Sequence, residues 1–306
     1  MSKSFVVLSM YEVHMASAAI MVDGVVKAAY HEERFSRLKN DVGFPLLAAK
    51  YCIKKAGIDP LDIDEVAISN SEFNKNGVAN IMFKRPATYS IDDWIEENEK
   101  YWRKTLINGS NIDTYFDLMG GYDRVKDHYY DFDSLDFKDP GSIFSKNFNE
   151  IRRNTVEKLL GIPQEKVVFY PHYKCHHYHA YYSSPFRGND VVIVHQEGDG
   201  GRYNSGVSIP TEKGLKWISG SNQSDLGRLY QWITLLMGMK PYHHEYKLMG
   251  LAPYATEYEV KKTLKKFSNI FCIDKKLLSI VYKNKPSDLY FHFRELLIGH
   301  RFDGIA

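Results

Sequence analysis

The sequence predicts an α/β protein built from two related lobes, and two observations carry this prediction. Near the amino terminus, short apolar strands joined by a hairpin lead into an amphipathic helix and then into a further strand. The same order of strands and helix begins again at residue 190. A β-β-β-α-β pattern that occurs twice is typical of two α/β lobes with a cleft between them, although the copies show no convincing residue-by-residue repeat.

The first copy is identified by its apolar alternation and its turn residues. Three strands are expected, at residues 4–9, 17–22 and 25–31. Asp23-Gly24 joins the last two strands and is a strong signal for a two-residue hairpin turn. A helix is expected over residues 46–57, because its apolar spacing is helical and Gly57 suits a left-handed cap. The next strand should follow at residues 64–69.

The second copy repeats the three strands and the helix. Its strands are expected at residues 191–196, 204–210 and 215–220. The helix should follow over residues 225–238. We therefore expect a first lobe at residues 1–189 and the start of a second lobe at residues 190–306. A twin lobe needs about as much chain as the first, so we expect the second lobe to be incomplete.

An aromatic and charged insertion separates the two copies, at about residues 84–150. The chain has 22 tyrosines, and many of them stand among charged residues in this stretch. One interpretation is a helical insertion whose rings pack against the main body. The alternative is a surface that binds an acceptor molecule. A helix that ends at Gly161 should follow the insertion.

Composition argues against several classes of protein. The 306 residues carry 40 Lys and Arg against 38 Asp and Glu, so the formal net charge of +2 does not indicate a protein that grips nucleic acid through phosphate. The three cysteines, Cys52, Cys175 and Cys272, are too widely spaced for a disulfide framework or a cysteine-based zinc module. No stretch reaches the roughly 20 apolar residues of a membrane span. We therefore expect a cytoplasmic protein with no membrane partner.

Histidines give the strongest local signal for chemistry. Five of the twelve histidines fall close together, at His172, His176, His177, His179 and His195. His172 and His176 are spaced i, i+4, which on a helix places both imidazoles on one face, as two ligands of one metal require. The alternative is a histidine-rich helix with satisfied hydrogen bonds and no metal.

Three further segments are weaker signals. Residues 195–201 form a Gly-rich turn after an apolar run, which suits either an anion cradle or a plain hairpin. His14 follows the first strand and precedes small residues, so it is either a site residue or a buried structural histidine. Residues 245–255 combine two charges with Gly250 and Pro253 at a helix end, and chemistry alone does not distinguish this segment from an ordinary loop.

Taken together, these segments resemble the amino-terminal part of the NodU/CmcH family of O-carbamoyltransferases. The opening is similar to the family's His-x-Ala-Ser-Ala-Ala strand, its Asp-Gly hairpin and its Glu-Glu-Arg-Phe-Ser/Thr-x-x-Lys stretch. The matching residues are His14, Ala16, Ser17, Ala18, Ala19, Asp23, Gly24, Glu32, Glu33, Arg34, Phe35, Ser36 and Lys39. Residues 172–186 look like its His-x-x-x-His helix with a trailing Ser-Pro-Phe. Residues 225–255 look like its Leu-Gly-x-Leu-Tyr helix and Lys-x-Met-Gly-Leu-Ala-Pro-Tyr loop.

The resemblance implies a fold and a reaction. The fold is an actin/Hsp70-like (ASKHA, ribonuclease H-like) duplicated lobe, similar to the catalytic subunit of tRNA threonylcarbamoyl-transferase. A following YrdC-like domain makes carbamoyl-adenylate from carbamoyl phosphate and ATP. The first lobe then moves the carbamoyl group to an acceptor hydroxyl, which we expect on a sugar, a nucleoside or a hydroxymethylated DNA base. The alternatives are a non-catalytic scaffold module of the same fold and a metal-dependent hydrolase.

The resemblance also implies roles for individual residues. A divalent metal, with iron as the first expectation, is held by the two histidines and by aspartates, and His14 assists removal of the acceptor's proton. The implied nucleotide-binding residues are Gly198, Asp199, Gly200 and Gly201. The implied substrate-binding residues are Arg34, Lys39, Glu245 and Lys247.

Two departures from the family pattern limit the resemblance. The family's Asp-Gly-x-Gly-Asp turn aligns to residues 195–199, so that His195 stands where the family has an aspartate ligand. We expect a metal site of His172, His176 and His195, with Glu197 as the alternative third ligand. The family's last metal-binding aspartate and its YrdC-like domain should lie beyond Ala306. We therefore expect a truncated or split protein, completed by a second chain or acting as a homodimer.

Overall fold

The computed structural model describes residues 4–84, 90–102, 112–120, 125–126, 129–188, 190–197, 202–224, 226–241, 244–286 and 289–306. The chain divides into two compact units. The first unit comprises residues 1–89 and 111–175, and the second comprises residues 90–110 and 176–306. Each unit contains a β-sheet of its own.

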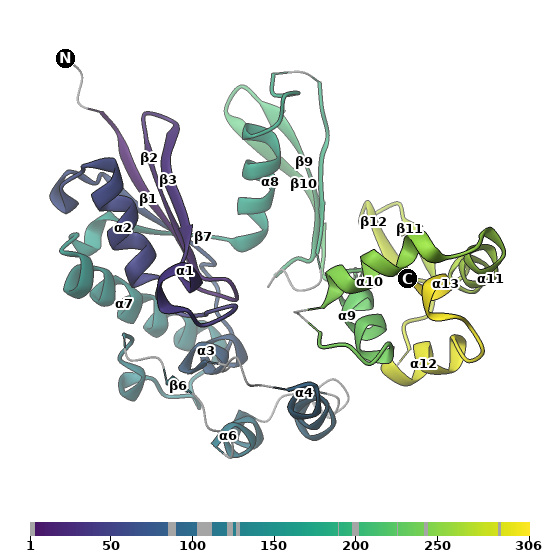
Figure 1. The fold of residues 1–306 in the computed structure, drawn as a ribbon. Helices are drawn as coiled ribbons and strands as arrows, with labels where there is room; N and C mark the ends of the chain where they lie inside the picture. The colour runs from purple at the N-terminus through teal and green to yellow at the C-terminus, as the bar shows by residue number, and fades with distance from the viewer. Residues whose placement is uncertain are drawn as a thin grey trace. The chain divides into compact units, whose positions relative to one another are not determined.

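A five-stranded sheet with the order β3-β2-β1-β4-β7 forms the centre of the first unit (Figure 1). Its strands are β1 (Val6–Tyr11), β2 (Ser17–Val22), β3 (Val25–His31), β4 (Glu65–Ser69) and β7 (Val167–Tyr170). β2 pairs antiparallel with both β1 and β3, whereas β1 and β4, and β4 and β7, pair in parallel. The mixed sheet confirms the α/β class that the sequence predicts.

Helices α2 (Leu46–Ala56) and α7 (Gly141–Leu160) pack against this sheet and bury its core face. Every second residue of β1 points into that core, and Val6, Leu8 and Met10 are at most 3% exposed. The alternation follows from the period of two of a strand, so Ser9 lies on the opposite, open face. The outward residues of the strands therefore line this open face.

Four turn and cap residues behave as the sequence predicts. Asp23 and Gly24 both have positive φ, at 50° and 78°, which a tight hairpin of this kind requires. α2 ends at Gly57, which is left-handed with φ 67°. α7 likewise ends at Gly161, with φ 71°. At these positions the left-handed backbone favours glycine because a side chain would be strained.

The remaining described elements of the first unit are short. They are α1 (Glu33–Ser36), η1 (Pro60–Asp62), α3 (Lys75–Met82), β5 (Phe83–Lys84), α6 (Ile112–Gly120), β6 (Val125–Lys126), η3 (Phe132–Ser134) and η4 (Gln164–Lys166). In the described part of the insertion, aromatic rings pack against the main body. Phe137 contacts both Phe116 and Phe144, with ring centroids 4.8 and 4.9 Å apart, and Tyr130 lies 5.4 Å from Phe148 of α7. These contacts favour the interpretation of a packed insertion.

The second unit contains a three-stranded antiparallel sheet with the order β10-β9-β8. The described elements are α4 (Ile91–Glu97), η2 (Asn98–Trp102), β8 (Ile193–Gln196), β9 (Ser205–Thr211), β10 (Gly214–Ser221), α9 (Leu226–Leu236), α10 (Glu245–Leu251), η5 (Ala252–Tyr254), α11 (Glu257–Phe267), β11 (Phe271–Asp274), β12 (Ser279–Tyr282), α12 (Leu289–Leu296) and α13 (Phe302–Ile305). The three strands and α9 lie where the sequence predicts them.

The second copy differs from the first in the elements that come after its helix. Among the described residues, no parallel strand joins the sheet of β8, β9 and β10. The later strands β11 and β12 pair with each other instead. The chain between α9 and β11 folds mainly into α10 and α11, whose sequence has helical rather than strand periodicity.

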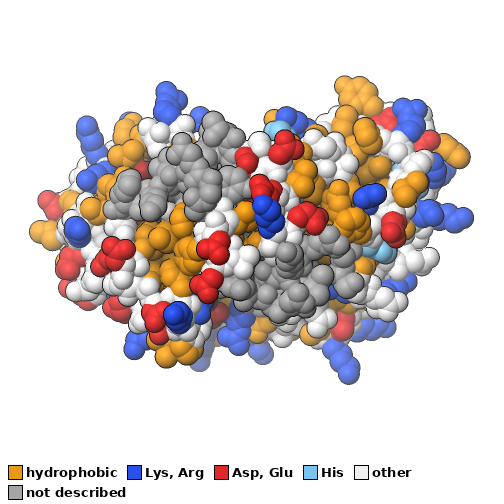
Figure 2. Space-filling model, turned by 90° about the horizontal axis from the view of Figure 1, so that it is seen from below, with side chains coloured by type: hydrophobic (Ala, Val, Ile, Leu, Met, Phe, Trp, Pro, Cys, Tyr) orange, Lys and Arg blue, Asp and Glu red, His pale blue; other side chains and the backbone are white. Residues whose placement is uncertain are grey.

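None of the helices in the described part of the chain combines the length and the apolar character needed to cross a bilayer. On the face drawn in Figure 2, acidic and basic side chains are interspersed rather than gathered into one basic field.

Candidate functional site

Helix α8 (His172–Tyr182) carries the first two residues of the candidate metal site. The boundary between the two units falls inside this helix, so the helix itself places His172 and His176 one turn apart on one face. Glu197 lies directly after β8, and its Oε2 is 3.2 Å from Nε2 of His176. One ligand atom from each of His172, His176 and Glu197 lies within 4.8 Å of the others.

Two imidazoles and one carboxylate are a suitable donor set for a divalent transition metal. Three protein ligands with a further position left for water or substrate are typical of catalytic sites. Two histidines with one carboxylate also suit non-haem iron. The residues present therefore fit the metal that the resemblance implies, with Glu197 supplying the negatively charged ligand.

A second layer of polar groups lies behind Glu197 in the second unit. Oε1 of Glu197 is 3.3 Å from Nε2 of His195, and Nδ1 of His195 is 2.7 Å from Nε2 of His177. Nδ1 of His177 is in turn 2.6 Å from the hydroxyl of Ser208 on β9. Both ring nitrogens of His195 therefore contact protein groups. The role of His195 as a metal ligand stays a prediction, and the geometry groups Glu197 with the two histidines of α8.

His176 and His177, which are neighbours on α8, differ in the direction in which their pKa values are shifted. Burial lowers the pKa of His177 to about 4, with the neighbouring histidines acting in the same direction. The hydrogen bond from His176 to Glu197 raises the pKa of His176 against the opposing effect of burial. His177 is therefore neutral at physiological pH, whereas His176 is stabilised in its protonated form when no metal is bound.

An indole ring covers the second layer. The ring of Trp217 on β10 lies 4.8 Å from that of His177 and rests on Gly206 and Gly220. These two glycines are directly paired across β9 and β10. A Cβ atom at either position would collide with the indole ring. The glycines thus provide the space in which Trp217 shields His177 from water.

His14 lies in the loop between β1 and β2. His14 is exposed at the surface, yet the atoms around its ring disfavour the charged form by desolvation and lower the pKa of the imidazole. The loop is held on both sides, because Ala16 donates its N–H to the carbonyl of Asp41 at 2.8 Å and Gly43 donates to the carbonyl of Glu12 at 2.7 Å. The backbone around His14 is therefore fixed by hydrogen bonds.

The acidic residues of the Glu-Glu-Arg-Phe stretch support the fold. The buried carboxylate of Glu32 accepts hydrogen bonds from the N–H groups of Leu47 and Ala48, at 3.0 and 2.7 Å, and so caps α2, whose N-cap is Pro45. Glu33 accepts hydrogen bonds from the backbone of Asn40 at 2.8 Å and from Lys39 at 3.1 Å.

The four expected substrate-binding residues fall in different units. Arg34, on α1 of the first unit, is exposed, and Lys39 forms an ion pair with Glu33. Glu245 and Lys247 lie on α10 of the second unit. The expected nucleotide-binding residues Gly198, Asp199, Gly200 and Gly201 lie outside the described residues. Both sets of assignments stay predictions.

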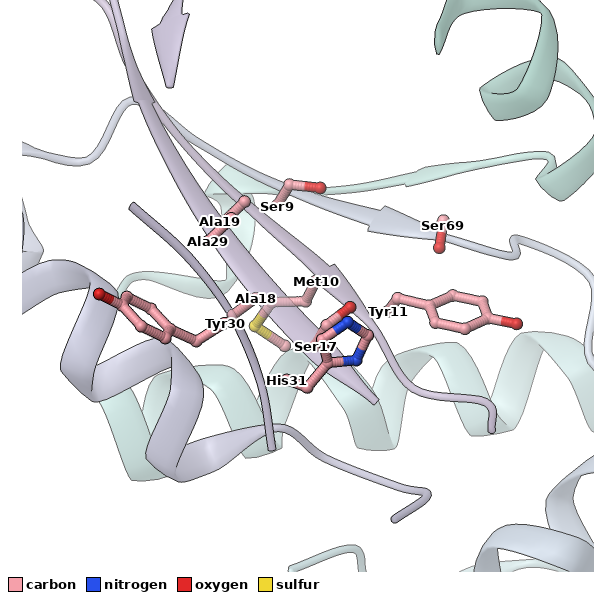
Figure 3. Close-up of a pocket in the computed structure, with 10 residues that line it drawn as sticks. All are labelled: Ser9, Met10, Tyr11, Ser17, Ala18, Ala19, Ala29, Tyr30, His31 and Ser69. Atoms are coloured by element: carbon pink, nitrogen blue, oxygen red, sulfur yellow. The ribbon is translucent and has the colours of Figure 1, made fainter. Parts of the chain in front are cut away.

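A pocket of about 220 Å³ lies on the face of the first sheet that is opposite α2 and α7 (Figure 3). The residues that line it are Ser9, Met10, Tyr11, Ser17, Ala18, Ala19, Ala29, Tyr30, His31 and Ser69. The ring of Tyr11 also stacks on that of His172, with centroids 5.8 Å apart and an interplanar angle of 21°. The sequence analysis did not identify this pocket. Its signal is the series of small residues at outward positions of β1, β2 and β3.

Comparisons with known proteins match most of the chain to one family. The sequence model of the family described as carbamoyltransferase N-terminus matches residues 6–285. An uncharacterized protein of Synechocystis sp. is 43% identical over 53 residues, which are 17% of this chain and 9% of that protein. An uncharacterized 19.2 kDa protein of Rhizobium etli is 34% identical over 76 residues, 24% of this chain and 44% of that protein. Each match thus spans less than half of the relative's length.

Proposed function

Since the chain belongs to the carbamoyltransferase family through its N-terminal domain, we propose that it is an enzyme of the transferase type and that it moves a carbamoyl group from carbamoyl-adenylate to an acceptor hydroxyl. The observation that carries this proposal is the cluster of His172, His176 and Glu197. The proposed acceptor is a sugar, a nucleoside or a hydroxymethylated DNA base. Carbamoyl-adenylate would come from carbamoyl phosphate and ATP.

The cluster would hold one divalent metal, and its two imidazoles and one carboxylate suit the iron that the resemblance implies. When bound, the metal supplies Lewis-acid chemistry to the carbamoyl group. Glu197 balances part of the metal's charge, and the two imidazoles of α8 fix its position. The Gly-rich segment at residues 198–201 follows Glu197 directly in the sequence, and its backbone N–H groups would bind the adenylate phosphate.

His14 would accept the proton of the acceptor hydroxyl. A neutral hydroxyl is a poor nucleophile and needs a base within hydrogen-bond reach. The lowered pKa keeps His14 neutral, and thus able to accept a proton, near pH 7. The pocket on the open sheet face offers hydroxyl and small side chains beside Tyr11, which contacts His172, so it is suited to receive part of the acceptor.

Elemental analysis of the purified chain tests the metal site on which the proposed function depends. The wild-type chain should hold about one divalent transition metal, and His172→Ala should lose it, because two remaining ligands are too few to retain the ion. His179→Ala is the matched control, since His179 is an exposed histidine of the same helix that is outside the cluster. Equal metal content in the wild type and in folded His172→Ala would refute the site.

A further inference from the structure

Four polar side chains of the second unit form a continuous line of hydrogen bonds that ends at the candidate metal site of His172, His176 and Glu197. The line begins at the hydroxyl of Ser208, passes through the rings of His177 and His195, and ends at Oε1 of Glu197. The first three residues are buried, with Ser208 1%, His177 2% and His195 8% exposed. Buried polar groups in such a line must each find a partner of the correct hydrogen-bonding type.

The charge of Glu197 determines the direction of these hydrogen bonds. An ionised carboxylate only accepts, so Nε2 of His195 must carry the proton that faces it. When both rings are neutral, Nδ1 of His195 accepts from Nε2–H of His177, and Nδ1 of His177 accepts from the hydroxyl of Ser208. The opposite direction would place a lone pair of His195 against the carboxylate. With both rings neutral, this arrangement satisfies every group, and both rings are then protonated at Nε2.

The strand geometry explains why a carboxylate at residue 197 meets a histidine at residue 195. Residues i and i+2 of an extended strand point to the same side. Glu197 continues the extended chain after β8, because its N–H donates to the carbonyl of Asn204 at 2.8 Å. His195 and Glu197 thus lie on the same side of the chain, and His195 supports the carboxylate from behind while Oε2 of Glu197 faces His176.

We propose that His195 and His177 are positioning residues that orient the Glu197 carboxylate as a metal ligand, and that His195 is not itself a ligand. This inference rests on the proposed metal site. It accounts for the histidine at the position where the family's aspartate aligns, because the negatively charged ligand comes from two residues later and the histidine holds it in place. Hydrogen bonds to a ligating carboxylate commonly fix its orientation in this way.

The tautomers are measured first, on the metal-free wild-type chain, by ¹H–¹⁵N NMR correlation of the histidine rings. Both His177 and His195 should be protonated at Nε2 and unprotonated at Nδ1. Ser208→Ala removes the hydroxyl donor and should release His177 from this single tautomer. A wild-type His195 protonated at Nδ1 would overturn the proposed line of hydrogen bonds, whatever the metal affinity.

Metal affinity is then measured with Co²⁺ as the probe. His195→Leu removes the donor to Glu197 and should weaken Co²⁺ binding about 10–100-fold, the usual effect of losing such a partner. His195→Gln keeps an amide donor and should recover part of the affinity. His179→Leu makes the same change at an exposed position of α8 and should bind as the wild type does.

The outcomes separate this inference from the proposed function. A wild type that binds no Co²⁺ would refute the metal site. A wild type that binds Co²⁺, together with a folded His195→Leu chain that binds as tightly as His179→Leu, would overturn the positioning role and leave the metal site intact. Complete loss of Co²⁺ in both His195→Leu and His195→Gln, as expected for His172→Ala, would instead identify His195 as a ligand.

Discussion

The carboxylate of Glu12 and the guanidinium of Arg152 form an ion pair in which both side chains are fully buried. The partners are far apart in sequence: Glu12 follows β1, and Arg152 lies on α7. Tyr130 donates its hydroxyl to the same carboxylate, and Arg152 also donates to the carbonyl of Asn70 at 2.9 Å and to the side chain of Asn149 at 2.8 Å. This network connects the loop that carries His14 to α7.

Breaking this ion pair should strongly destabilise the chain. Arg152→Met removes one partner and leaves the carboxylate of Glu12 buried without its counter-charge, which typically costs about 3–5 kcal/mol. Urea unfolding measures the loss. Lys158→Met is the matched control, because Lys158 is an exposed residue of the same helix, and it should change the free energy of unfolding by no more than about 0.5 kcal/mol. Similar values for the two variants would show that the pair does not hold the loop.

Alanine should have opposite effects at two glycines of the second unit. At Gly206 a Cβ atom would collide with the ring of Trp217, so Gly206→Ala should displace the indole and lower the free energy of unfolding by about 1–3 kcal/mol. At Gly250, on α10, a Cβ atom would meet open space, and Gly250→Ala should raise stability by up to about 1 kcal/mol. Equal effects in urea unfolding would contradict the packing of Trp217 on the glycine pair.

Metal binding should depend on pH through His176. Its pKa lies above the ordinary value of 6.5, chiefly because of the hydrogen bond to Glu197. The protonated pair therefore stabilises the metal-free chain fully below the unfolded-state pKa, and this stabilisation is lost as pH rises through the raised folded-state pKa.

A metal ion and a proton compete for the same nitrogen of His176, so the metal affinity follows the opposite trend. Co²⁺ affinity should increase as pH rises through the raised pKa and level off above it. Titrations of Co²⁺ at a series of pH values, with the His176 resonance followed by NMR in the metal-free chain, make the comparison. An affinity that stays constant across the titration of His176 would exclude this residue as a ligand.

Local structure was predictable from the sequence where single residues enforce it. The hairpin at Asp23-Gly24 and the ends of α2 and α7 at Gly57 and Gly161 were predicted correctly, because each needs a left-handed backbone that few residues adopt. Strand β7 was not predicted, since it has only four residues and pairs with β4 about 100 positions away. Such non-local pairing leaves little trace in a short window of sequence.

The candidate site was predictable in part for the same reason. The spacing of His172 and His176 indicates one helix face whatever the fold, and α8 confirms that both lie on one helix. The contacts of His195 could not be predicted, because they depend on how α8 packs over β8 and β9. Strand periodicity indicates that residues 195 and 197 share a side, but only the packed structure shows that Glu197 reaches His176 and that His195 reaches His177.

The proposed role of His14 is tested by separating the two half-reactions, in a protein that unites this chain with a domain that makes carbamoyl-adenylate. His14→Asn should leave pyrophosphate release, which accompanies adenylate formation, near the wild-type rate. Transfer of the carbamoyl group to the acceptor should fall about 10²–10⁴-fold, the usual range for a lost general base. His179→Asn, an exposed change on α8, should preserve both rates.

If His14 only supports the loop after β1, both half-reactions and the thermal stability of His14→Asn should decline together. Transfer near the wild-type rate in the folded variant would remove His14 from the mechanism.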